Sequence, residues 1–147
     1  MTKQPFIVAP NEYGPALSVL GAQITVLASN AKTFGYEITL QAGDEGVGPP
    51  PHSHDWDESF FVLEGQVEFL LKSGPVVCKA GTLVHVPAET VHSFRFCAGG
   101  GRMVEITGQG ARATQMFQRV SNGFPAGPTD IPRLVNVLQQ NGVTVAA

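Results

Sequence analysis

Short stretches in which apolar and polar residues alternate dominate the chain up to about residue 107. Successive side chains of a strand point to opposite faces, so this alternation predicts β-strands with one buried face. We expect strands at residues 6–8, 23–28, 36–41, 58–63, 66–72, 76–79, 82–86, 90–96 and 102–107. Several strands, including residues 58–63, are apolar on both faces, which predicts that both faces are covered.

Glycine and proline separate these strands. Turn residues occur at Glu64-Gly65, Ser73-Gly74-Pro75, Ala80-Gly81, Pro87-Ala88-Glu89 and Ala98 to Gly101. Three consecutive prolines at residues 49–51 predict a stiff loop that makes no ladder hydrogen bonds. No helical pattern interrupts the strands, so the arrangement predicts an all-β antiparallel sandwich or barrel.

The periodicity becomes helical after Gly110. Apolar residues follow one another at helical spacing, namely Ala113, Met116, Phe117 and Val120, and then Ile131, Leu134, Val135 and Leu138. We expect helices at about residues 111–120 and 130–141, joined by a Gly/Pro loop at 122–128, with Thr129 or Asp130 as the second N-cap. Both helices are expected to pack outside the barrel, so residues 1–147 are interpreted as one domain whose barrel core spans about residues 35–107.

Composition narrows the classes of partner. Charged residues make up 14% of the chain, and the nine Lys and Arg residues are scattered, so no nucleic-acid-binding surface is expected. No apolar run approaches the roughly 18–20 residues that cross a membrane, and residues 1–5 lack the apolar core of a signal peptide. We therefore expect a cytoplasmic protein with no membrane partner, in which Cys78 and Cys97 are free thiols.

The candidate chemistry lies in the histidines. His52 and His54 are one residue apart, so a strand would point both imidazoles to one face. Glu58 follows a short polar connection, and His92 supplies a third imidazole. Imidazoles with one carboxylate form a ligand set for a divalent transition metal and leave positions open for substrate. We predict that these four residues bind one ion; the alternatives are a metal-free pocket and an acid–base role for Glu58.

Apolar residues on the neighbouring strands are candidates for the wall of a substrate pocket. They are Trp56, Phe60, Val62, Phe69, Phe94 and Phe96. At each position, ordinary core packing is the alternative. His85 is interpreted as structural or superficial, and Glu37 and Glu105 are strand carboxylates that are candidates to orient a ligand histidine.

Two spaced motifs resemble those of the cupin superfamily. The first, G-x5-H-x-H-x3-E-x6-G, matches at Gly46, His52, His54, Glu58 and Gly65, and the second, G-x5-P-x-G-x2-H-x3-N, matches at Gly81, Pro87 and His92. The second motif departs at Glu89, where the family usually has Gly, and at Phe96, where it often has Asn. The resemblance implies a cupin jelly-roll antiparallel β-barrel with a short C-terminal helical tail, holding a metal on three histidines and Glu58.

Among small cupins, the chain is similar to bacterial quercetin-dioxygenase-like proteins in its N-terminal arm, its H-x-H-x3-E block followed by F-F-V-L-E-G, and its helical tail. That resemblance implies a metal-dependent dioxygenase, an oxidoreductase acting on a small aromatic or enol-type hydroxylated compound, with Glu58 as the catalytic proton acceptor. A redox-neutral isomerase or cyclase and a non-catalytic small-molecule-binding cupin are the alternatives.

Ligand type leaves several metals open. Three imidazoles and one carboxylate suit Fe, Mn, Ni, Cu, Co or Zn, and affinity order does not choose among them. The expected partners are a small-molecule substrate and, for an oxygenase, dioxygen. A homodimer is also expected, because strands that are apolar on both faces need cover.

Overall fold

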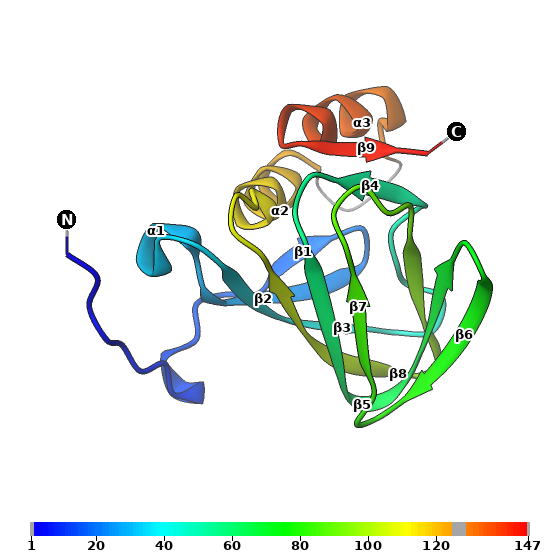
Figure 1. Cartoon of the computed structure of the whole chain (residues 1–147), viewed down its shortest axis with the longest axis horizontal. Coiled ribbons are helices and arrows are strands. Elements are labelled where there is room, and N and C mark those ends of the chain that lie inside the picture. The colour runs from blue at the N-terminus through cyan, green and yellow to red at the C-terminus, as the bar shows by residue number, and fades with distance from the viewer. Residues whose placement is uncertain (1, 125–128, 147) are drawn as a thin grey trace.

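The computed structural model describes residues 2–124 and 129–146 (Figure 1). Its elements are a 3-10 turn (Pro10–Glu12), β1 (Leu17–Val19), β2 (Ala22–Ala28), α1 (Asn30–Thr33), β3 (Glu37–Gly43), β4 (His52–His54), β5 (Glu58–Leu71), β6 (Gly74–Lys79), β7 (Leu83–Val86), β8 (Ser93–Thr107), α2 (Ala113–Gly123), α3 (Ile131–Gln140) and β9 (Val143–Val145). The predicted all-β class is confirmed. The strand expected at residues 6–8 is absent, because this arm lies on the surface and pairs with no described strand.

Antiparallel pairing organises the molecule. The larger sheet has seven strands in the order β1-β2-β3-β8-β5-β6, and β7 also pairs with β5. The smaller sheet consists of β4 and β9. Figure 1 shows this second sheet directly beside α3, above β5 and β7 in this view.

Two of the predicted turns are wrong, because they lie within the strands β5 and β8. Glu64-Gly65 and Ala98 to Gly101 do not end strands but lie inside these long strands, where the register shifts through β-bulges. Gly65 has φ 71°, and a Cβ there would lie 2.2 Å from the Gly100 carbonyl oxygen. Glycine at position 65 therefore allows the backbones of β5 and β8 to approach closely at a bend. The bend lets one strand contribute to both halves of the barrel.

Two hydrophobic clusters fill the fold. One lies inside the barrel and contains Phe60, Val62, Val67, Phe69, Cys78, Val86, Phe94, Phe96 and Met103. The other joins α2 and α3 to β2, Trp56 and β9. Both predicted helices are confirmed, and Asp130 caps α3 by accepting a hydrogen bond from the Arg133 N–H at 3.1 Å. Part of the loop expected at residues 122–128 lies outside the described residues.

The strand β9 is the main feature that the sequence pattern did not predict. It pairs with β4 in the register His52↔Val145 and His54↔Val143, so the C-terminal segment holds the strand that carries two candidate ligands. Cys78 and Cys97 are both free, as expected. None of the helices in the described ranges is long and apolar enough to span a bilayer.

Candidate metal centre

Three histidines converge at one end of the barrel. The candidate ligand atoms of His52, His54 and His92 all lie within 4.8 Å of one another. Two backbone hydrogen bonds join their chain segments, from the His52 N–H to the His92 carbonyl at 3.0 Å and in the reverse direction at 2.9 Å. Segments that are far apart in the sequence are thus locked together at the imidazoles.

Backbone carbonyls orient each imidazole. The Nδ1 atoms of His52, His54 and His92 lie 2.8 Å, 2.9 Å and 2.8 Å from the carbonyl oxygens of Pro50, Trp56 and Thr90. A carbonyl only accepts, so each Nδ1 carries the donated hydrogen and a neutral ring keeps its lone pair on Nε2. This tautomer, with a carbonyl as the partner of the other ring nitrogen, is the form in which histidine binds a metal.

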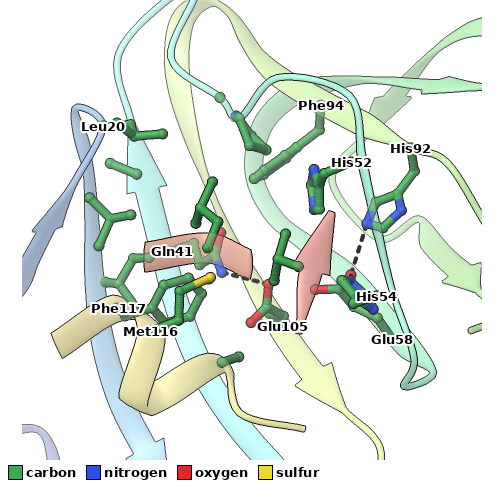
Figure 2. Close-up of a pocket in the computed structure, with 18 of the residues that line it drawn as sticks. Leu20, Gln41, His52, His54, Glu58, His92, Phe94, Glu105, Met116 and Phe117 are labelled. Carbon is green, nitrogen blue, oxygen red and sulfur yellow. Dashed lines mark hydrogen bonds and ion pairs between the residues drawn. The ribbon is translucent and has the colours of Figure 1, made fainter. Parts of the chain in front are cut away.

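Glu58 lies beside these nitrogens at the start of β5. Its Oε2 is 2.8 Å from His54 Nε2 and 3.0 Å from His92 Nε2, and all three side chains are buried (Figure 2). Burial acts to raise the pKa of Glu58, but hydrogen bonds from His54 and His92 outweigh it and the pKa lies below its usual range. An ionised carboxylate beside the Nε2 atoms completes a donor set that fits a divalent transition metal.

The pKa values of two of the imidazoles, His52 and His92, shift in opposite directions. Burial lowers the pKa of His52 to about 4, so its Nε2 is unprotonated at neutral pH. Burial also acts to lower the pKa of His92, but the hydrogen bond and the charge of Glu58 raise it above its usual value. A bound cation would replace the protons that now lie between the imidazoles and the carboxylate, which makes metal binding proton-coupled.

Two neighbours hold His54 in place. The Trp56 ring stacks on the His54 ring with centroids 4.3 Å apart and planes 6° apart. On the other side, the Glu89 N–H donates to the His54 carbonyl at 2.8 Å. Glu89 has φ 67°, a left-handed conformation that costs a non-glycine residue about 1 kcal/mol, at the very position where the family usually has Gly. Position 89 thus has the left-handed backbone that glycine adopts most readily, although the residue is Glu.

A cavity of about 90 Å³ opens from this centre towards α2 and α3. The three histidines and Glu58 line one end, and most of the remaining wall is apolar, including Leu20, Ile24, Phe60, Phe94, Met116, Phe117, Leu138 and Val143. No Lys or Arg is among the described residues that line it. The site therefore combines a metal-binding end with a largely apolar chamber that contains the Glu105 carboxyl group.

The residues predicted for the pocket wall divide into two groups. Trp56, Phe60 and Phe94 line the cavity. The structure instead places Val62, Phe69 and Phe96 in the cluster inside the barrel, at 0%, 1% and 1% exposure. Side-chain parity identifies the inward face of a strand but not the depth along the barrel, which the bulges in β5 and β8 determine.

The sequence did not predict that two buried polar residues, Gln41 and Glu105, line the cavity. Gln41 on β3 donates from Nε2 to Glu105 Oε2 on β8 at 2.8 Å, and the Thr39 hydroxyl lies 3.4 Å from Glu105 Oε1. Burial, together with the charge of Glu58, raises the pKa of Glu105 well above its usual value. The available signal in β3 was the alternation of polar residues, because Glu37, Thr39 and Gln41 are its buried positions.

The two strand carboxylates do not orient the histidines, because backbone carbonyls do so. Glu105 lies beside Gln41 as described. Glu37 instead accepts hydrogen bonds from the Thr114 N–H at 3.1 Å and the Asn30 N–H at 3.3 Å. It thereby satisfies backbone donors at the beginnings of α2 and α1.

Comparison with known proteins agrees with this geometry. The family model described as "Cupin domain" matches residues 36–107. The quercetin 2,3-dioxygenase of Bacillus subtilis (strain 168) is 31% identical over 83 residues, which cover 55% of this chain and 25% of that enzyme. The aligned segment thus spans only about a quarter of the relative, so this match does not transfer the activity of the whole enzyme.

Solved structures share the fold. KdgF from Halomonas sp. superposes with a TM-score of 0.68 at 17% identity, covering 76% of this chain and 99% of KdgF. The polyketide cyclase RemF from Streptomyces resistomycificus superposes with a TM-score of 0.62 at 17% identity, covering 71% of this chain and 80% of RemF. Identities this low establish a common architecture and leave the reaction to be argued from the site.

Proposed function

This chain belongs to the cupin superfamily, and from that premise we propose that it is a metal-dependent dioxygenase acting on a small aromatic or enol-type hydroxylated compound. The observation that carries the proposal is the convergence of three carbonyl-oriented imidazoles at the end of an apolar cavity. The similarity to part of a quercetin 2,3-dioxygenase supports the same class of reaction.

Each part of the site has a role in this proposal. His52, His54 and His92 would hold the ion with Glu58, and the ion when bound would supply a Lewis acid and, if redox-active, electron exchange with dioxygen. Glu58 lies where it would accept the proton of a substrate hydroxyl. Phe94 and Leu138 in the cavity wall would keep water from the reacting groups, which strengthens electrostatic interactions there.

Dioxygen uptake tests the reaction type. Protein reconstituted separately with Fe, Mn, Ni, Co and Cu would be given single-ring catechols, hydroxypyranones and diketones, with quercetin alongside them. We expect uptake well above the protein-free metal blank with at least one redox-active ion, and none with the zinc-loaded protein, because zinc has no redox chemistry. Compounds that bind to every metal form without any uptake would contradict the dioxygenase proposal.

A redox-neutral isomerase or cyclase is the second candidate, and the two buried carboxyl groups favour it. Their pKa values move in opposite directions, with Glu58 lowered and Glu105 raised, which is the arrangement expected of a proton acceptor beside a proton donor. Sugar-phosphate substrates fit poorly, since no Lys or Arg is among the described lining residues. Conversion of a panel compound without dioxygen consumption, followed by NMR, would support this candidate.

A homodimer is the expected assembly, because the outer face of the large sheet is apolar. Phe61, Leu83 and Ile106 are 40%, 62% and 41% exposed, and Phe61 is directly opposite Leu83 in the pairing of β5 with β7. We expect sedimentation velocity at micromolar concentration to give a dimer for the wild type and a monomer for Phe61→Glu, since a buried unpaired charge opposes association. A monomeric wild type would contradict this prediction.

A further inference from the structure

We propose that Gln41 and Glu105 form a recognition site for a second polar group of the substrate, and that the substrate is an uncharged compound about one ring in size. The inference rests on the proposed metal-dependent function and deepens it. One end of the ligand would bind at the histidines, and a hydroxyl group elsewhere on the ligand would meet the Gln41 amide. Glu105 is a positioning residue in this arrangement.

The first support is the location of the two residues. Gln41 on β3 and Glu105 on β8 both line the cavity that the histidines line. Figure 2 shows them between the histidine cluster and the side chains of Met116 and Phe117, with the hydrogen bond between them drawn. A ligand held at the histidines and extending towards α2 would therefore pass this pair.

The second support is the hydrogen-bonding capacity that the amide retains. Gln41 is 2% exposed, and within residues 2–124 and 129–146 its side chain makes the one hydrogen bond to Glu105, from Nε2. Because a carboxyl group accepts from Nε2, the amide is turned so that Oε1 and the second N–H remain for another partner. A buried amide with unused capacity favours a ligand that supplies a hydroxyl over one that presents a methyl group.

The third support is the size and charge of the chamber. Its volume of about 90 Å³ is below the roughly 150 Å³ of an engineered apolar cavity that admits benzene. A single ring would therefore need a small outward shift of the wall, and a three-ring flavonol would need a much larger one at Met116 or Leu138. No Lys or Arg is among the described lining residues, and Glu105 lies in the wall beyond the histidines, so an anionic group at the end of the ligand away from the metal would be buried without a counter-charge.

A matched pair of probes tests the inference. Kojic acid and allomaltol share the same hydroxypyranone metal-binding group and differ only in a hydroxymethyl group against a methyl group. Their dissociation constants would be measured by calorimetry on zinc-reconstituted protein, in which no oxidation occurs. We expect the wild type to bind kojic acid roughly 5- to 15-fold more tightly, the effect of one hydrogen bond to an otherwise unpaired buried group.

Variants connect the preference to the amide. Gln41→Met, and Gln41→Leu as a second choice of packing, are expected to bring the ratio of the two constants close to 1, with zinc content measured alongside. Gln23→Leu is the matched control, since Gln23 is exposed on β2 and is not among the cavity-lining residues; it should keep the wild-type ratio.

The outcomes separate this inference from the function on which it rests. Equal binding of both probes by zinc-loaded wild type, or a preference that survives in both Gln41 variants, would overturn the recognition role and leave the metal site intact. Failure of zinc or of allomaltol to bind the wild type would overturn the proposed metal-dependent function, and the recognition role with it. A preference lost equally in Gln23→Leu would also overturn the assignment to Gln41.

Discussion

Purified without chelator and without a metal-affinity tag, the wild-type protein is expected to hold close to one divalent transition-metal ion per chain, and His54→Ala is expected to lose it. His54 supplies one of three clustered ligand atoms, and its Nδ1–H is fixed by the Trp56 carbonyl at 2.9 Å. Residues that merely support a ligand contribute roughly 10- to 100-fold to metal affinity, so loss of a ligand itself should exceed about 100-fold. Elemental mass spectrometry and competitive metal titration measure both quantities.

His85→Ala is the matched control for this experiment. His85 is an exposed imidazole whose Nδ1 lies 2.9 Å from the Ser59 hydroxyl on the outer face of the sheet, away from the cavity. The control should retain wild-type metal content. Equal metal content in His54→Ala and wild type, or a wild type that stays metal-free after reconstitution, would refute the assignment of the site.

Gly48→Ala is expected to cause a large loss of stability. A Cβ at Gly48 would lie 1.8 Å from the Phe94 carbonyl oxygen, and backbone cannot move aside as a flexible side chain does. The overlap should lower the free energy of unfolding by about 3 kcal/mol or more, at or beyond the upper end of typical overpacking costs.

The same substitution should also weaken the metal site. The loop around Gly48 follows β8 through hydrogen bonds from the Gly46 N–H to the Phe96 carbonyl at 2.8 Å and from the Phe96 N–H to the Val47 carbonyl at 3.0 Å. This loop leads directly into β4, so pushing it away from β8 separates His52 from His92. We expect a clear loss of metal affinity in any Gly48→Ala protein that folds.

Gly35→Ala separates this steric effect from the general cost of replacing glycine. No atom lies within 4 Å of a Cβ built at Gly35. Its unfolding free energy should stay within about 0.5 kcal/mol of wild type, as for most surface substitutions. Urea denaturation of the metal-free proteins makes the comparison, and equal stability of the two variants would show that the loop relaxes without cost.

The strands and the helices were accessible from local pattern because burial on one face imposes a period on the sequence. The boundaries of β5 and β8 were not, because glycine is equally suited to a turn and to a bulge. A positive φ such as the 71° of Gly65 is compatible with either a turn or a bulge, so the residue type does not distinguish them. What decides between them is the backbone of Gly100, which approaches from another strand.

The same division holds within the site. Strand parity placed His52 and His54 on one face, since neighbours at i and i+2 share a face, and the spacing of the second motif added His92. The partners of their Nδ1 atoms are carbonyls two residues away, local features that a sequence does not display because every residue has a carbonyl. Gln41 and Glu105 carried a weaker signal, as inward polar residues on separate strands.

The sequence by itself determined the family, the all-β class, the two C-terminal helices and the three histidines, because each depends on periodicity or fixed spacing along the chain. The existence and the lining of the chamber were decided only by the tertiary structure. Its wall combines Leu20, Met116, Leu138 and Val143, brought together by the packing of α2, α3 and β9 against the open end of the barrel. Such contacts arise from how separate elements pack, and no local pattern in the chain records which surfaces will meet.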